Sequence, residues 1–117
     1  MNDQQIEAEI QAKGLTAPRV TPEDIEANIR GEYYFTAAQA MEHAGEYHEK
    51  GSPLHLLTFC VLELRNGFTV TGESACVSPE NFNADDGRMY ARENAVNKIW
   101  PLMGYELKCR LSASADR

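Results

Sequence analysis

Hydrophobic positions in the first part of the chain repeat with the period of a helix. Ile6 and Ile10 lie one turn apart in a polar background, which predicts a short helix with a narrow apolar stripe over residues 3–13. Gly14 and Pro18 interrupt the pattern, because glycine commonly ends helices and the residue before a proline disfavours helix. We expect this N-terminal helix, within residues 1–18, to be loosely packed.

The clearest helix start lies at Thr21. Its hydroxyl can cap the free backbone amides, Pro22 suits the first helical position, and Asp24 adds negative charge to the first turn. Ile25 and Ile29 supply the buried stripe of this second helix.

A third helix is predicted from about Thr36, after three aromatic residues at positions 33–35 that pack at its start. One side of this helix carries small and apolar residues: Ala37, Ala40, Met41 and Ala44. The stretch GEYHEKGSP that follows reads as a loop.

The period then changes from that of a helix to that of strands. The segments HLLTFCVLEL and FTVTGESA are rich in β-branched, aromatic and aliphatic residues, and Asn66-Gly67 between them predicts a hairpin with a two-residue turn. That turn pairs Arg65 with Phe68 and Glu63 with Val70.

One sheet face would hold Leu57, Phe59, Val61, Phe68 and Val70. The other would hold Cys60, Leu62 and Leu64 opposite Thr69, Thr71 and Glu73. This second face is too apolar to remain in water, so we expect the N-terminal helices or a second subunit to cover part of it.

The last third predicts a helix followed by a strand. Ala91, Ala95 and Ile99 repeat every fourth residue over 84–100, and the two alanines allow close approach to a sheet. Alternating polarity in YELKCRL predicts a third strand over 105–111, and residues 112–117 are expected to form a disordered tail. The fold class is therefore α+β: N-terminal helices, a β-hairpin, a helix and a third strand forming a small antiparallel sheet with helices packed on it.

The chain has 117 residues, of which 43% are hydrophobic and 25% charged, which fits a single domain over 1–117. Its apolar runs are short and its N-terminus is acidic, so we expect no membrane segment, no secretion signal and a cytoplasmic location. Three widely spaced cysteines, with no C-x-x-C pair, favour reduced thiols over a metal site; Cys60 and Cys109 fall at apolar strand positions.

The net charge of −7 is concentrated in the first half of the chain, since residues 1–55 carry −6 and residues 56–117 carry −1. No strong cluster of Lys and Arg occurs, which disfavours direct nucleic-acid binding. An acidic half can engage a basic partner or mimic DNA, although an acidic face often serves only solubility.

The loop 69–88, TVTGESACVSPENFNADDGR, is where catalytic or metal chemistry would be sought. GESAC lacks the final glycine of a nucleophile elbow, and NFNADDG fails the EF-hand pattern at Asp86 and Arg92. His43, His48 and His55 show no paired metal spacing.

We predict no catalytic, cofactor or metal residues. The residues most suited to contact a ligand or partner are Glu73, Asn81, Asn83, Asp85, Asp86, Arg88 and Arg92. Arg88 and Arg92 could hold a phosphate, or could pair with Asp85, Asp86 or Glu93.

Three stretches resemble a family of small tailed-phage and prophage proteins, typified by gene product 49 of phage N-four and gene product 66 of phage Sf-six. They are RVTPEDIEANI, CVLELRNGFTVTGESACVSPENFNADDG and ARENAVNKIWPLMGYELKCRL. The resemblance covers about residues 19–111, least well in 36–55, and carries over no catalytic residue. It implies a phage or prophage gene product that acts in the bacterial cytoplasm.

Three functions follow as hypotheses. The first is a non-enzymatic accessory protein that binds a host or phage protein, to modulate host metabolism or block a defence. The second is a small ligand- or nucleotide-binding domain or enzyme that uses the region from Glu73 to Arg92. The third is a minor virion component. A homodimer is also expected if the sheet stays uncovered.

Overall fold

The computed structural model describes residues 2–15, 17–46 and 49–115. The chain divides into two compact units, which are described separately: a terminal unit, residues 1–28 with 99–117, and a sheet unit, residues 29–98. The expectation of a single domain stays a prediction. The described elements are α1 (Asp3–Ala12), α2 (Pro22–Ala27), β1 (Ile29–Thr36), α3 (Ala37–His43), the 3-10 helix η1 (Pro53–Leu56), β2 (Leu57–Leu64), β3 (Thr69–Ala75), the 3-10 helix η2 (Pro79–Asn81) and α4 (Ala84–Ala115).

Three helices begin with the same capping arrangement, in which the cap side chain and the side chain three residues later each accept from the other's backbone amide. Asn2 caps α1, Thr21 caps α2 and Thr36 caps α3 in this way. The predicted helix starts at Thr21 and Thr36 are therefore confirmed. The face predicted for α3 is wrong, because Ala38 is its buried residue while Met41 is exposed.

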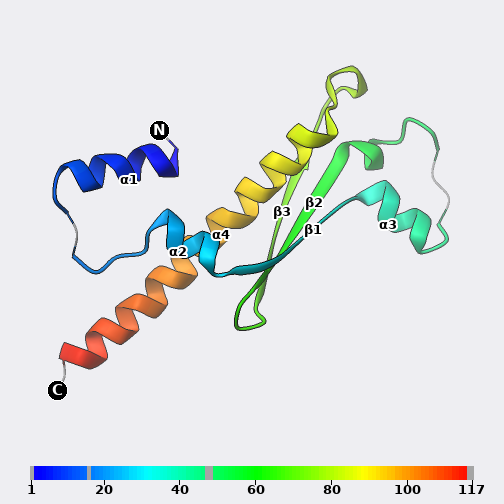
Figure 1. Ribbon diagram of the computed structural model, residues 1–117. Coiled ribbons are helices and arrows are strands. Elements are labelled where there is room, and N and C mark those ends of the chain that lie inside the picture. Colours follow the sequence, from blue (N-terminus) through cyan, green and yellow to red (C-terminus); the bar gives the residue numbers. More distant parts are fainter. Residues whose placement is uncertain (1, 16, 47–48, 116–117) are drawn as a thin grey trace. The chain divides into compact units, whose positions relative to one another are not determined.

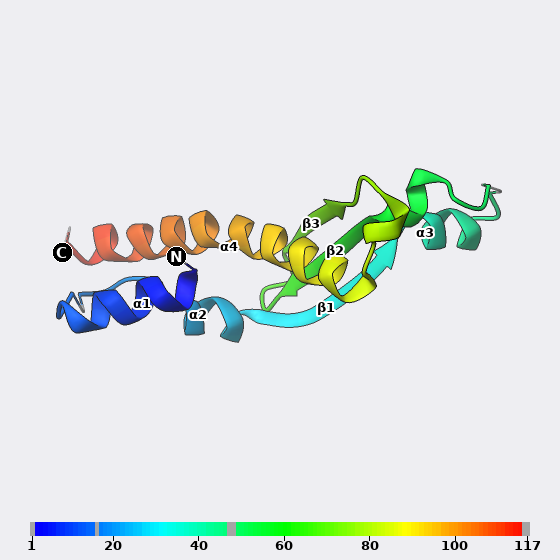
Figure 2. The same cartoon turned by 90° about the horizontal axis from the view of Figure 1, so that it is seen from above.

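The sheet unit contains an antiparallel sheet in the order β1-β2-β3, with β2 at its centre (Figure 1). Burial along β2 alternates between buried and half-buried positions, as expected for a strand with one face in the core. Figure 2 shows α3 past the end of β1 rather than over the sheet. The α+β class and the three-stranded antiparallel sheet are confirmed.

The third strand is β1, and the prediction of a strand over 105–111 is wrong. Residues 29–36 pair with β2 from Ile29 opposite Leu64 to Thr36 opposite Thr58, with a bulge between Ile29 and Gly31. The aromatic residues at 33–35, expected to pack at a helix start, are strand residues, in keeping with the preference of aromatic side chains for sheets.

Helix α4 continues where a helix end and a strand were predicted. Pro101 lies inside α4, where it removes one backbone hydrogen bond without ending the helix. The segment 105–111 is therefore helical, and Cys109, expected on the inner face of a strand, is exposed. Residues 112–115 of the expected disordered tail belong to α4, while 116–117 lie outside the described residues.

The hairpin forms as predicted, but its register is shifted by one residue. Leu64 pairs with Phe68 across a three-residue loop, and Gly67 in that loop has a φ of 89°. Leu62 therefore pairs with Val70, where the two-residue turn had placed Glu63. A one-residue shift turns every side chain of β3 to the other face, so the predicted face assignments of Phe68, Val70, Thr69, Thr71 and Glu73 are all wrong.

Within the sheet unit, the apolar face of β2 is covered by α4, an element that the prediction of N-terminal helices or a second subunit had not named. Cys60, Leu62 and Leu64 are buried there. Gly72 of β3 lies directly beneath α4, since a Cβ placed on it would come within 2.2 Å of the Ala91 carbonyl oxygen. Ala91 and Ala95, predicted to allow close packing against a sheet, are both completely buried.

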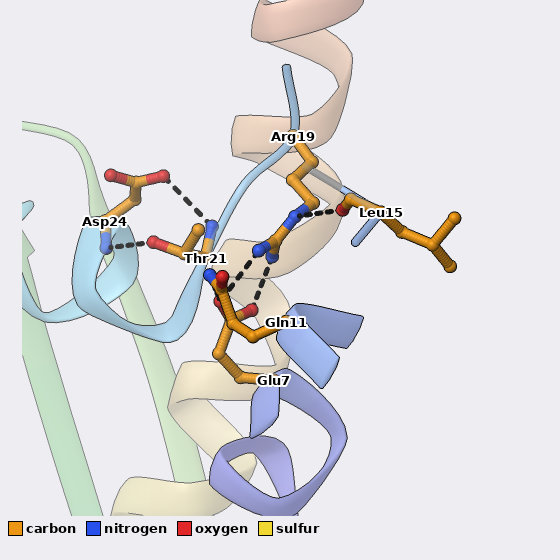
Figure 3. A network of polar contacts seen from close by, with 6 residues as sticks. All are labelled: Glu7, Gln11, Leu15, Arg19, Thr21 and Asp24. Atoms are coloured by element: carbon orange, nitrogen blue, oxygen red, sulfur yellow. Dashed lines mark hydrogen bonds and ion pairs between the residues drawn. The ribbon is translucent and has the colours of Figure 1, made fainter. Parts of the chain in front are cut away.

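The terminal unit consists of α1, α2 and the part of α4 from Ile99 onward. Its α1 was expected to be loosely packed, and α1 has no buried residue. Polar contacts connect α1 to the rest of this unit. The Trp100 indole donates to Asp3 at 3.1 Å, and Arg19 forms an ion pair with Glu7 (Figure 3).

Candidate functional site

The seven residues predicted to contact a ligand or partner lie along the connection from β3 to α4, but they do not form one cluster. Glu73 is exposed on β3, and its backbone carbonyl accepts from the Asn94 side chain at 2.8 Å. Asn81 ends η2. The other five, Asn83, Asp85, Asp86, Arg88 and Arg92, lie at or within the start of α4.

Asn83 caps α4. Its side-chain oxygen accepts from the Asp86 amide at 3.0 Å, and its carbonyl accepts from the Gly87 amide at 2.9 Å. Arg88 pairs with Asp85 three residues earlier, which confirms one of its predicted partners. These contacts make the acidic residues of the loop part of a helix start.

Arg92 forms an ion pair with Glu32 of β1, a partner that was not among those predicted. Glu32 also accepts from the Tyr34 hydroxyl at 3.4 Å. Burial raises the pKa of Tyr34 to about 12 and also raises the pKa of the Cys60 thiol beside it. Neither group ionises near neutral pH, so neither is an activated nucleophile or base.

A pocket of about 530 Å³ lies in the sheet unit, beside the start of α4. Its lining combines apolar side chains with hydroxyl, amide, imidazole and guanidinium groups. The lining residues are Tyr34, Phe35, Thr36, Gln39, His55, Leu56, Thr58, Pro79, Phe82, Ala84 and Arg88. Of the seven predicted contact residues, Arg88 is the one that this lining includes.

Sequence reasoning missed this pocket, because its lining comes from β1, α3, η1, β2, η2 and α4, which only the tertiary structure brings together. The weak signal available was the polar Thr58 at the start of an otherwise apolar strand. Thr58 is 3% exposed, and its hydroxyl lies under Gly87, where an added Cβ would be 2.9 Å from the Thr58 oxygen.

A second surface is the sheet face opposite α4, which we call the open face. Its apolar side chains are half-buried or exposed: Tyr33, Phe35, Leu57, Phe59 and Val61. Phe35 and Phe59 stack with ring centroids 5.4 Å apart, and Tyr33 is 55% exposed.

The hairpin end of the open face carries an ion pair, in which Arg30 lies 3.0 Å from Glu63. The Arg30 guanidinium holds the pKa of Glu63 below its usual value. The open face thus has an aromatic centre and a charged border, as protein interfaces commonly do.

The terminal unit has a smaller pocket of about 230 Å³ beside Trp100. It is lined by Ile6, Ile10, Val20 and Pro22, together with Asp3 and Glu7.

Within residues 2–15, 17–46 and 49–115, no group of three or more His, Cys, Asp and Glu side chains is placed to hold a metal ion. His43 ends α3 and His55 lies in η1, whereas His48 lies outside the described residues. Among the helices of the described part, none has the length and apolar character needed to cross a bilayer.

Comparison with protein families gives one match. The model of a family described as "Phage protein (N4 Gp49/phage Sf6 gene 66) family" matches residues 20–111. This agrees with the resemblance found over about 19–111. The comparison with curated proteins finds no significant match, and neither does the comparison with solved structures.

Proposed function

The chain belongs to the Phage protein (N4 Gp49/phage Sf6 gene 66) family, and from this membership we propose that it is a non-enzymatic accessory protein of phage infection. It acts in the bacterial cytoplasm by binding a host or phage protein through the open face. The partner has an apolar surface bordered by basic residues.

The observation that carries this proposal is the open face itself. A sheet that packs one face on a helix normally leaves a polar face to water. Here most outward positions of β1 and β2 carry aromatic and aliphatic side chains, and Tyr33 is the most exposed of these five residues. Exposed aromatic residues at the centre of a patch are typical of protein-binding surfaces.

Charge favours a basic partner over a second copy of the chain. Residues 1–55, which include β1, carry a net charge of −6, and the whole chain carries −7. Two copies would repel each other, whereas a basic surface would be attracted and its association accelerated. A homodimer through the same face is the competing arrangement.

The absence of enzymatic activity is supported by the state of the nucleophilic groups near the pocket. Burial raises the pKa of both Tyr34 and Cys60, which keeps them protonated, and the exposed carboxylates of the loop serve the start of α4. A nucleophilic cysteine generally has a lowered pKa instead.

The proposal is tested by quantitative co-purification of tagged protein from phage-infected cells. Tyr33→Ala and Phe59→Ser change the open face, and Phe68→Ala is the matched control, because Phe68 is 54% exposed and lies opposite Leu64, which is buried on the face covered by α4. We expect one partner to be recovered with wild type and Phe68→Ala, at least tenfold less with Tyr33→Ala, and less still with Phe59→Ser.

Circular dichroism spectra of each variant establish that it is folded, and sedimentation of the purified protein measures self-association. The proposal fails if Tyr33→Ala and Phe68→Ala recover the same proteins in equal amounts. It also fails if the protein sediments as a dimer that Tyr33→Ala dissociates, which would assign the open face to a second copy.

A further inference from the structure

The pocket beside the start of α4 has the dimensions and the mixed lining of a small-molecule site. Its volume of about 530 Å³ lies within the range of about 300–1,000 Å³ that ligand pockets occupy. Phe82, Pro79 and Leu56 form apolar walls, while Gln39 and Tyr34 bring polar groups to the lining.

Thr58 marks a missing hydrogen-bond partner inside this pocket. Thr58 lines the pocket and is only 3% exposed. Within the described ranges, its hydroxyl makes no side-chain hydrogen bond. Buried polar groups are normally hydrogen-bonded, so an unpaired hydroxyl in a pocket wall indicates that the partner comes from outside the chain.

Arg88 and the start of α4 set the charge that the pocket accepts. Arg88 lines the pocket, and the side chain of its partner Asp85 is 87% exposed. Water can therefore hydrate the Asp85 carboxylate when Arg88 binds a ligand instead. The first turn of a helix of 32 residues adds positive potential from its free amides. Neither Asp85 nor Asp86 is among the lining residues.

We propose that this pocket binds a small organic anion with an apolar body. The acid group of the ligand lies on Arg88 and accepts a hydrogen bond from the Thr58 hydroxyl, and its apolar body lies against Phe82 and Leu56. The ligand class follows from the combination of a guanidinium, a buried donor and apolar walls in one cavity. This inference does not rest on the proposed partner binding, since the residues argued to hold the ligand lie outside the open face; Phe35 borders both surfaces.

The experiment uses the full chain and three probes: phenylacetate, which has both an acid group and an apolar body; 2-phenylethylamine, a cation of similar shape; and inorganic phosphate, an anion without an apolar body. Ligand-detected NMR and isothermal titration measure binding of each. We expect phenylacetate to bind with a millimolar dissociation constant, and the other two probes to bind at least tenfold more weakly.

Two variants and one control locate the site. Arg88→Gln should weaken phenylacetate binding about tenfold, since it removes a charge-assisted hydrogen bond. Thr58→Val should weaken it about threefold without lowering thermal stability, because the lost hydroxyl has no partner in the free protein. Arg110→Gln is the matched control: Arg110 also pairs with a carboxylate of its own helix, Glu106, but does not line the pocket.

The outcomes separate cleanly. Loss of affinity in Arg88→Gln and Thr58→Val, with none in Arg110→Gln, supports the proposal. Failure of phenylacetate to bind overturns it, as does equal binding of 2-phenylethylamine or of phosphate. Unchanged affinity in Thr58→Val together with reduced stability would show that the hydroxyl serves the fold and would also overturn it.

Discussion

Gly72 and Gly104 show how differently one residue type can matter along this chain. A Cβ on Gly72 would come within 2.2 Å of the Ala91 carbonyl oxygen and 2.3 Å of the Ala95 amide nitrogen, both of them backbone atoms that cannot move aside. A Cβ on Gly104, in the second half of α4, would meet nothing within 4 Å.

Gly72→Ala should therefore lower the free energy of unfolding by about 3 kcal/mol, because the methyl group pushes α4 away from the sheet. Gly104→Ala should raise it by about 1 kcal/mol, because alanine has the higher helix propensity. Urea denaturation of both variants measures the two effects. Equal effects of the two substitutions would contradict the close approach of α4 to β3.

The ion pair of Glu7 with Arg19 predicts a pH effect in the terminal unit (Figure 3). The hydrogen bond from Arg19, supported by one from Gln11, lowers the pKa of Glu7 to about 2. A carboxyl group with a lowered pKa stabilises the folded state above its unfolded pKa, and that contribution is lost as the pH falls.

Wild type should thus lose stability relative to Glu7→Gln between pH 4.5, the ordinary value, and about pH 2. Urea denaturation at pH 6, 4 and 2.5 gives the comparison. Glu9→Gln on the same helix is the control. A constant difference between wild type and Glu7→Gln across this range would rule out the pairing.

Among the elements, α4 contains the most unusual sequence feature, a proline in its interior. Pro101 has no amide hydrogen to donate to the preceding turn, which costs a helix interior about 3 kcal/mol relative to alanine. Pro53 occupies the contrasting position, at the start of η1, where no such hydrogen bond is lost.

Pro101→Ala should accordingly raise the thermal midpoint and strengthen the helical circular dichroism signal, with a gain in free energy of about 1–3 kcal/mol. Pro53→Ala should be neutral or slightly destabilising, because it adds freedom to the unfolded chain. A lower midpoint in Pro101→Ala would contradict this expectation.

For the whole molecule, burial predicts an order of local stability. The central strand β2 has buried residues at every second position, whereas α1 has none. Segments with little buried surface open at low free energy. Amide hydrogen exchange should therefore be fast in α1 and slowest in β2 at pH 7. Comparable protection factors in the two elements would contradict this order.

Sequence patterns predicted local structure well and chemistry poorly. The caps at Thr21, Thr36 and Asn83 and the Asn66-Gly67 hairpin were all predictable, because each depends on neighbouring residues. The candidate pocket was not predictable, because Thr58 and Arg88 are 30 residues apart and lie on different elements.

Alternation alone misassigned the third strand. YELKCRL alternates in polarity, yet it continues a helix, because the backbone hydrogen bonds of α4 satisfy it without a sheet partner. Residues 29–36 form the third strand because they pair with the edge of β2 that β3 does not occupy. This pairing joins residues far apart in the sequence, and no local pattern encodes it.

The amino-acid sequence by itself determined the α+β class, the starts of the helices, the hairpin and, through its resemblance, the phage family. These depend on short-range hydrogen bonding and on the spacing of apolar residues. Only the tertiary structure decided the register of β3, which face α4 covers, and which side chains meet in the pocket. A one-residue change in a turn reverses a whole strand face, and in the register that forms, Gly72 lies directly against α4, where a side chain would not fit.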